Sequence, residues 1–205
     1  MEEVTGETYG PLKAACDRIV REILGEKCTV VRPTYVVGPG DHTDRFTYWV
    51  ESVYRGGDVL APSGPDLEAQ WVDARDLCPW LITLGENDTP GIFNAAGPSS
   101  SVDRAGMMWG LRAQTSAPVT LYWPDPDLLT ELGLNLPMMS HGDPSERFEN
   151  QASMAAGLNY RSLTDTAAGI LEWWHSQPEE RRANARRWPE PEKVQAAIER
   201  IKAQS

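Results

Sequence analysis

The sequence is poor in the residues that build disulfide frameworks and metal sites. Among its 205 residues, the only cysteines are Cys16, Cys28 and Cys78. Because they are odd in number and scattered, they argue against a disulfide framework and fit a protein of the reducing cytoplasm. The only histidines are His42, His141 and His175. These are too widely spaced to predict a ligand set, and we expect no metal.

Long apolar runs and positive charge are also scarce. No stretch approaches the roughly 18–20 apolar residues of a membrane helix. The chain does not open with the charged and then apolar leader of a secretion signal, so we expect none. Its net charge is −11, from 19 Lys and Arg against 30 Asp and Glu. An acidic surface repels phosphate backbones, so we expect neither nucleic acid nor a membrane as a partner.

Several motifs of nucleotide and hydrolase chemistry are missing. The sequence contains no G-x-x-G-x-x-G, no G-x-G-x-x-G, no P-loop, no H-E-x-x-H and no G-x-S-x-G. The glycines at 38–40 and 55–57 lack the strand and helix that should flank a phosphate-binding loop. They therefore predict turns.

What the sequence does contain is an alternation of short β-branched runs and amphipathic segments, which predicts an α/β fold with a largely parallel sheet. The expected strands are 28–33, 58–62, 69–73, 91–98 and 118–123, and the expected helices are 8–25, 44–55, 74–86, 102–113, 126–133 and 164–175. Residues 134–150 have no clean period and predict irregular structure. Residues 177–205 hold seven Lys and Arg against five Asp and Glu, and predict a separate, charged helical tail after a domain of residues 1–176.

Some helix boundaries carry their own signals. Thr43 or Asp44 is the expected N-cap of the second helix, Gly56 its end, and Asp73 the N-cap of the third. Thr164 or Asp165 is the expected cap of the helix at 164–175. Pro11 is expected in the first turn of the first helix, where its missing N–H costs little.

The helix at 8–25 begins with Tyr9 and Lys13, which are four residues apart and hence on one face. A lysine ammonium beside a phenol favours the phenolate and lowers its pKa from about 10. A tyrosine tuned in this way gives or takes a proton at a carbonyl or hydroxyl. The alternative interpretation is a surface tyrosine that packs on a lysine stem.

Two further stretches give the pair its context, "VVRPTYVVGPGDHTDRFTYW" at 30–49 and "AQWVDARDL" at 69–77. The series resembles the extended short-chain dehydrogenase/reductase family, in its NAD-dependent epimerase/dehydratase group. There a Y-x-x-x-K helix leads into a strand ending in R-P-x-x-V-x-G-P, followed by a substrate-side loop and a strand reading roughly F-I/V-D-V-R-D-L. The resemblance runs from about residue 2 to residue 175. It implies a partial Rossmann-like parallel sheet with flanking helices and a small C-terminal substrate-binding region.

The resemblance also implies roles for individual residues. Tyr9 is the catalytic tyrosine, and Lys13 is its partner, which in the family also holds the nicotinamide ribose of NAD or NADP. The segment that borders the nicotinamide is Pro33, Thr34, Tyr35 and Val36. The substrate pocket, for a small molecule, is built from Asp44, Arg45, Tyr48, Trp49, Gln70 and Trp71. Alternative, purely structural roles remain open, with Asp44 as a helix cap and both tryptophans in the core.

The sequence departs from the family in two ways. The family begins about a hundred residues earlier, with the first strand, the Gly-rich turn, the acidic ribose ligand and the catalytic Ser or Thr. Thr5 and Thr8 are near Tyr9, but nothing assigns them that hydroxyl. Many sugar-nucleotide members have an arginine where this chain has Gln70, which disfavours a UDP-sugar.

Three interpretations follow. The chain is the C-terminal portion of an NAD(P)-dependent oxidoreductase or epimerase, incomplete alone, which self-associates or pairs with a missing N-terminal half. Alternatively, it is a cofactor-independent acid/base isomerase or cyclase, with tryptophan-rich walls around an apolar substrate. In the third interpretation it is a non-catalytic binding or assembly module.

Overall fold

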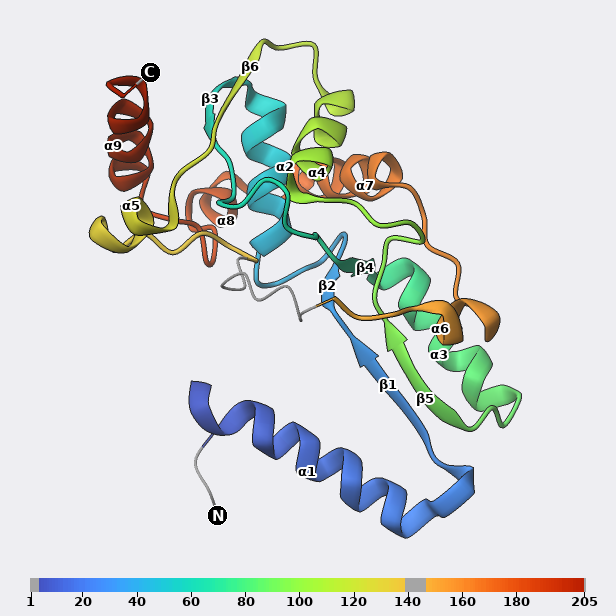
Figure 1. Cartoon of the computed structure of the whole chain (residues 1–205). Coiled ribbons are helices and arrows are strands. Elements are labelled where there is room, and N and C mark those ends of the chain that lie inside the picture. Colours follow the sequence, from blue (N-terminus) through green and yellow to red (C-terminus); the bar gives the residue numbers. More distant parts are fainter. Residues whose placement is uncertain (1–3, 139–146, 205) are drawn as a thin grey trace.

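The computed structural model describes residues 4–138 and 147–204, and its elements alternate as an α/β fold (Figure 1). The strands are β1 (Thr29–Pro33), β2 (Tyr35–Val37), β3 (Gly57–Leu60), β4 (Trp71–Asp73), β5 (Gly91–Ala95) and β6 (Val119–Tyr122). The α-helices are α1 (Gly6–Leu24), α2 (Arg45–Arg55), α3 (Ala74–Glu86), α4 (Arg104–Leu111), α5 (Pro126–Glu131), α6 (Gln151–Ala155), α7 (Leu163–Ser176), α8 (Glu179–Ala183) and α9 (Pro191–Lys202). Two short 3₁₀ turns are η1 (Gly25–Lys27) and η2 (Arg112–Gln114). All the predicted strands and helices are present, with ends shifted by a few residues.

The described strands pair in parallel, as the alternation of strands and helices predicts. They form three two-stranded sheets, in which β1 pairs with β5, β2 with β4 and β3 with β6. Val31 lies opposite Phe93 in the first sheet, and Val36 opposite Val72 in the second. β1 and β2 are almost continuous in sequence, so the first two sheets meet where Thr34 joins them.

The larger core gathers around α2, α4 and α7, together with β3. Its fully buried side chains include Phe46, Trp49, Met108 and Ile170. A smaller core lies under α3, where Trp80 meets Phe93 edge to face. Burial of these large apolar side chains contributes about 1.5–3 kcal/mol each.

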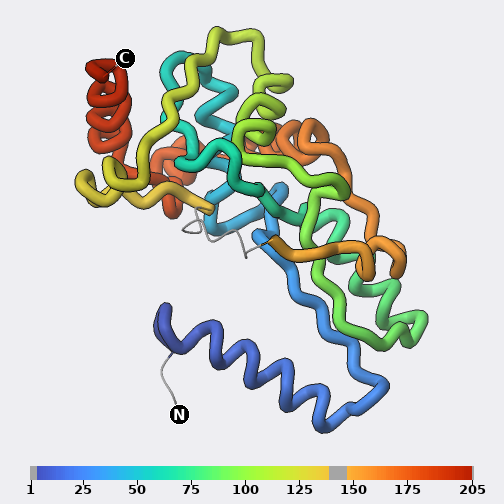
Figure 2. Tube along the Cα trace, in the orientation of Figure 1, coloured from blue at the N-terminus to red at the C-terminus, as the bar shows by residue number. Residues whose placement is uncertain are grey.

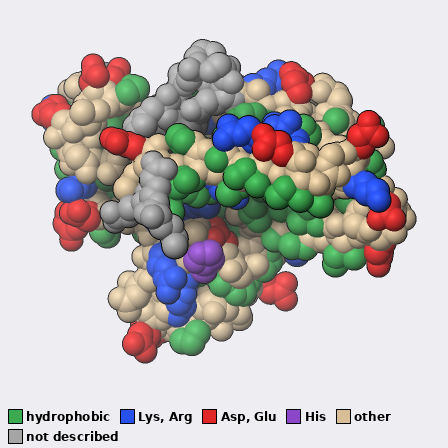
Figure 3. All heavy atoms as spheres, turned by 90° about the horizontal axis from the view of Figure 1, so that it is seen from below, with side chains coloured by type: hydrophobic (Ala, Val, Ile, Leu, Met, Phe, Trp, Pro, Cys, Tyr) green, Lys and Arg blue, Asp and Glu red, His purple; other side chains and the backbone are tan. Residues whose placement is uncertain are grey.

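Among the described helices of eight or more residues, only α1 has no buried residue. The trace in Figure 2 shows it apart from the remaining elements, which it joins through η1 and β1. Most of its apolar positions are exposed, among them Ile19, Val20, Ile23 and Leu24. Seen from below, the side on which α1 lies, hydrophobic side chains form a band across the surface (Figure 3).

The start of α1 corrects one expectation. Pro11 is inside the helix, beyond the first turn, because the helix begins at Gly6. Thr5 and Thr8 form a capping box there: the Thr5 hydroxyl accepts from the Thr8 N–H at 3.2 Å, and the Thr8 hydroxyl accepts from the Thr5 N–H at 2.8 Å. This reciprocal cap starts the helix before the proline.

Other boundaries follow their signals. Asp73 caps α3 by accepting from the Arg75 N–H at 2.9 Å, and Gly56 ends α2 as predicted. Asp44 is the N-cap residue of α2, although its side chain makes no capping bond. The predicted cap of α7 is wrong. Ser162 performs that role, accepting from the Asp165 N–H at 3.0 Å, so the helix begins at Leu163.

The charged tail after residue 176 is helical, with α8 and α9 on either side of Pro189 as predicted. It packs against the larger core, where Ala197 and Ile198 are buried and Trp188 contacts Trp174 with ring centroids 5.4 Å apart. The division of the chain at residue 176 stays a prediction.

Candidate functional site

A cavity of about 800 Å³ opens where the start of α1, the β1–β2 junction, α2 and the segment before β4 approach one another. Such a volume lies in the range of small-molecule sites. Its lining brings together eight residues predicted for the site, namely Tyr9, Pro33, Thr34, Tyr35, Val36, Arg45, Trp49 and Gln70. Residues separated by sixty positions in sequence therefore share one cavity, which we call the first cavity.

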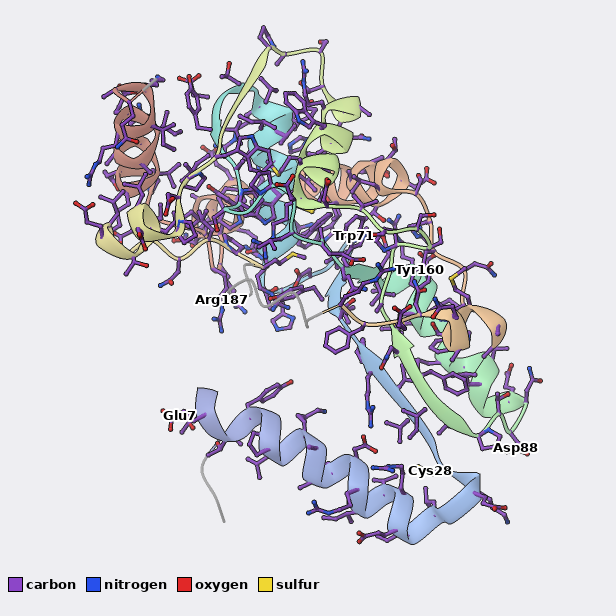
Figure 4. All side chains as sticks on the ribbon, viewed as in Figure 1. Glu7, Cys28, Trp71, Asp88, Tyr160 and Arg187 are labelled. Carbon is purple, nitrogen blue, oxygen red and sulfur yellow. The ribbon has the colours of Figure 1, made fainter. Side chains whose placement is uncertain are left out.

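Tyr9 enters the first cavity from α1, and its side chain is 58% exposed. Lys13 is exposed one turn further on and does not line the cavity. Figure 4 shows Glu7, two residues before Tyr9, at the N-terminal end of α1. Within the described residues, neither the Tyr9 hydroxyl nor the Lys13 ammonium has a side-chain hydrogen-bond partner.

A pair of charges ties α1 to β1 and so sets where Tyr9 lies. Arg32 on β1 donates to the Asp17 carboxylate through Nε at 3.1 Å and also through Nη2, and Arg21 donates to the same carboxylate at 2.7 Å. The Arg32 guanidinium beside Asp17 holds the pKa of that carboxyl below its usual range. Asp17 and Arg32 therefore position the helix that carries Tyr9.

Three arginines line the first cavity. The Arg45 guanidinium lies over the Tyr35 ring at 5.1 Å and donates through Nε to the Thr43 hydroxyl at 2.9 Å. Arg104 is buried and donates to the carbonyl of Ser63 at 2.6 Å. The third arginine, Arg147, lies 3.3 Å from a Glu68 carboxylate oxygen. Arginines in a concave site suit an anionic or strongly polar ligand.

Two of the predicted site residues fix the wall of the first cavity, because their side chains form hydrogen bonds with backbone groups. The Trp49 indole is buried and donates to the carbonyl of Pro137 at 3.0 Å. The Gln70 amide donates to the carbonyl of Phe148 and accepts from its N–H, both at 2.9 Å. Both residues thus shape the wall, since their polar side-chain atoms already form hydrogen bonds within the protein.

Asp44 does not line the first cavity, because its side chain is fully buried against residues of the C-terminal tail. The carboxylate accepts from the Arg181 guanidinium at 2.6 Å and from the Arg186 N–H at 2.7 Å. The Asp44 carbonyl accepts from the Trp188 indole at 3.0 Å. This network gives Asp44 a structural role, although a different one from the helix-capping bond that the sequence left open.

Trp71 and Tyr48 also lie outside the lining of the first cavity. Trp71 is buried and stacks on Phe46 with ring centroids 5.6 Å apart. Figure 4 shows it in the middle of the fold, close to Tyr160. Tyr48 turns instead toward Trp188 on the tail, at 5.6 Å.

Further residues of the first cavity come from segments without a motif, chiefly Asp66, Glu68, Arg104, Met107, Met138, Arg147 and Phe148. No periodicity or motif singled them out, although residues 134–150 were expected to be irregular and such segments often line sites. The glycines at 38–40 form a turn as predicted. Gly38 has φ +125°, and a Cβ there would lie 2.9 Å from Asp73 Oδ1.

Across residues 4–138 and 147–204, no three His, Cys, Asp or Glu side chains gather into a group that suits a metal ion. No helix in the same ranges has the length and apolarity that a bilayer crossing requires.

The arrangement of short parallel sheets flanked by helices defines the class of protein: an α/β protein with a partial Rossmann-like fold. Comparison with family models gave no match, and comparison with curated protein sequences gave none either. Comparison with solved structures did give matches.

Three of these structures illustrate the likeness. A GDP-L-fucose synthetase from Naegleria fowleri has a TM-score of 0.61 at 12% identity, over 90% of this chain and 58% of its own. An NAD-dependent NDP-hexosamine 5,6-dehydratase of tunicamycin biosynthesis has a TM-score of 0.58 at 16% identity, over 84% and 55%. The dTDP-4-dehydrorhamnose reductase from Bacillus anthracis, in complex with NADP, has a TM-score of 0.56 at 16% identity, over 82% and 55%.

The chain spans little more than half the length of these structures. At such identities the likeness establishes the fold. It is the fold that the motif resemblance implies.

Proposed function

We propose that this chain carries the substrate-binding half and the proton-transfer tyrosine of an NAD(P)-dependent oxidoreductase or epimerase/dehydratase of the short-chain dehydrogenase/reductase type. The observation that carries the proposal is that Tyr9 shares one cavity with Pro33–Val36, Arg45 and Trp49. The solved structures of similar fold support it, since their names describe reductases, dehydratases and synthetases that act on sugar nucleotides.

In this proposal, the Tyr9 phenol gives a proton to, or takes one from, a hydroxyl or carbonyl group of a small substrate in the first cavity. Lys13 assists from the next turn of α1. Arg45 and Arg104 offer positive charge to polar groups of the substrate. A bound nicotinamide cofactor supplies or accepts the hydride.

We propose that the described residues hold only the nicotinamide end of such a cofactor. The segment Pro33–Val36 lines a cavity roomy enough for a nicotinamide riboside beside a small substrate. The sequence offers no Gly-rich turn for the pyrophosphate. We propose that a nucleotide-binding half, encoded upstream or supplied by another chain, completes the site.

The experiment is a fluorescence titration with NADH and NADPH, followed by turnover assays on keto and hydroxy substrates. We expect the 205-residue chain to bind either cofactor no tighter than about millimolar. A chain that includes an upstream G-x-x-G-x-x-G segment should bind in the micromolar range. Tyr9→Phe in that longer chain should lower kcat by about 100-fold or more at an unchanged cofactor Kd. Unchanged turnover in Tyr9→Phe would refute the catalytic role.

A second candidate is a non-catalytic assembly module, and the wholly unburied helix α1 favours it. This candidate expects Tyr9→Phe and Lys13→Ala to leave every activity unchanged. It expects changes on the apolar face of α1 to abolish binding to a partner. The two sets of variants therefore separate the two candidates.

A further inference from the structure

A second cavity, of about 690 Å³, is also lined by α2, through a different set of its residues from the first. One wall comes from α2 and β3, and the other from residues 182–198 of the tail. Tyr48 lines the second cavity while the next residue, Trp49, lines the first. The proposed oxidoreductase chemistry makes no use of this second cavity.

One arginine in the lining of the second cavity, Arg182, has no side-chain partner in the part of the chain that the structure describes. The Nε of Arg182 is buried and makes no hydrogen bond. Among residues 4–138 and 147–204, no carboxylate forms an ion pair with its guanidinium. Such a group costs free energy unless an acceptor reaches it. Arg55 also lines the second cavity, with its guanidinium over the Trp188 ring at 5.7 Å, but its Nε lies 3.7 Å from a Glu51 carboxylate oxygen, so its charge is compensated.

The acidic side chains of the second cavity are already neutralised. Asp58 lies 2.7 Å from the Lys202 ammonium, which holds the pKa of Asp58 below its usual range. Glu190 lies 3.0 Å from Lys193. These pairs leave the charge of Arg182 uncompensated, so the second cavity presents a net positive end.

Apart from Ser52 and Gln195, the rest of the lining is apolar or aromatic. Leu60 and Ile198 are buried at its floor, and Val194 lies beside them. The Tyr48 side chain is only 6% exposed, and it meets Trp188 edge to face. A cavity with one cationic end and an apolar floor matches the usual build of a small-molecule site.

We propose that the second cavity is a binding site for a small organic anion, with a carboxylate or phosphate on Arg182 and an apolar body against Leu60, Val194 and Ile198. A guanidinium binds either anion through paired N–H donors. Dispersion and desolvation of the apolar body supply the remaining affinity.

The test is calorimetric titration of the 205-residue chain with phenyl phosphate, benzoate, inorganic phosphate and benzyl alcohol. We expect phenyl phosphate or benzoate to bind, with the tighter of the two identifying the anionic group. Inorganic phosphate and benzyl alcohol should each bind about tenfold more weakly or worse. Failure of both organic anions to bind at about 10 mM would overturn the proposal, and so would equal binding of inorganic phosphate.

Variants locate the binding. Arg182→Ala should weaken binding of the organic anion by about tenfold or more, as should Val194→Trp, which fills the second cavity. Arg186→Ala is the matched control, because its exposed side chain belongs to the same arginine run but lies outside the lining. Equal weakening by Arg186→Ala would overturn the proposal by indicating nonspecific attraction. Arg45→Ala, in the first cavity, should leave this binding unchanged, and thermal melts confirm that each variant folds.

Discussion

The Gln70 side-chain amide and the Phe148 backbone exchange two hydrogen bonds, each of 2.9 Å, across 78 positions of sequence. The Gln70 side chain thus forms with the Phe148 backbone the two hydrogen bonds that the backbone of a neighbouring β-strand would otherwise form. The pair holds part of the wall of the first cavity, which Tyr9 also lines. Gln70, a neutral residue, thus fixes the backbone of its own chain.

Gln70→Leu should release this wall. The substitution removes both bonds and leaves the Phe148 N–H and carbonyl to water, so we expect a loss of about 1–2 kcal/mol in the free energy of unfolding. Hydrogen exchange of the Phe148 amide should speed up, while exchange in α7 stays unchanged. Gln204→Leu, at the exposed end of the chain, is the control. An unchanged exchange rate at Phe148 would contradict the role assigned to Gln70.

Asp44→Asn should destabilise the contact between the tail and α2. Asp44 is fully buried, and its carboxylate faces an Arg181 guanidinium that is itself 28% exposed on the side chain. Removing one charge of a buried pair costs about 3–5 kcal/mol, and the exposure of Arg181 reduces this to about 2–3 kcal/mol. Urea unfolding measures the change.

The control for Asp44 must share its backbone conformation. Asp44 has φ 56°, in the left-handed region, where asparagine is as well tolerated as aspartate. Asp88 has φ 45° and is exposed, so Asp88→Asn repeats the exchange without the buried pair. Equal stability changes in the two variants would show that the Arg181 contact contributes nothing.

The local features of this fold could be predicted from the sequence, because they depend on residues that are close together in the chain. Alternating β-branched runs and helical periods placed every predicted strand and helix, and the glycine at position 56 marked the end of α2. Eight of the twelve predicted site residues line the first cavity, because their motifs lie at the start of α1, at the ends of strands and on the first turns of α2.

The remaining features depend on contacts that no local pattern encodes. Asp44 fits either a cap or a pocket until Arg181, 137 positions away, is seen to reach it. Tyr48 and Trp49 are consecutive aromatic residues of α2, yet Tyr48 lines the second cavity and Trp49 lines the first. The packing of the tail against α2 decides this difference, and no local pattern encodes that packing. Arg104 and Arg147 belong to no motif, so sequence reasoning had no signal for them.

Self-association should follow from the exposed face of α1. Ile23 is 74% exposed, and Val20 and Leu24 are exposed beside it. We expect sedimentation velocity to show mass that increases with protein concentration, and Ile23→Asp to suppress that increase. Ile82→Asp, at another exposed apolar position on α3, is the matched control. A chain that stays monomeric at every concentration would contradict the prediction.

Acid should destabilise the fold through Asp73. Burial raises the pKa of Asp73, but the hydrogen bonds and charge of Arg75 outweigh that effect and hold the pKa below its usual range. A depressed pKa contributes stability above the unfolded value of about 3.9, and this is lost as the pH falls further. Asp73→Asn should be less stable at pH 7 and should lose less stability between about pH 5 and pH 2. Parallel pH profiles of the two proteins would refute this account.

Alkali should act through Tyr48. Burial raises the pKa of Tyr48 to about 12, whereas the unfolded value is about 10. The folded state therefore holds the phenolic proton longer than the unfolded state does, and the stability from this group is complete below about pH 10. It falls between about pH 10 and 12, by up to about 1.4 kcal/mol per pH unit. In urea unfolding, Tyr48→Phe should show a shallower decline than wild type, while Tyr54→Phe, at a half-exposed position, should decline as wild type does. If Tyr48→Phe and wild type decline in parallel, burial of the phenol does not govern the alkaline limit of this fold.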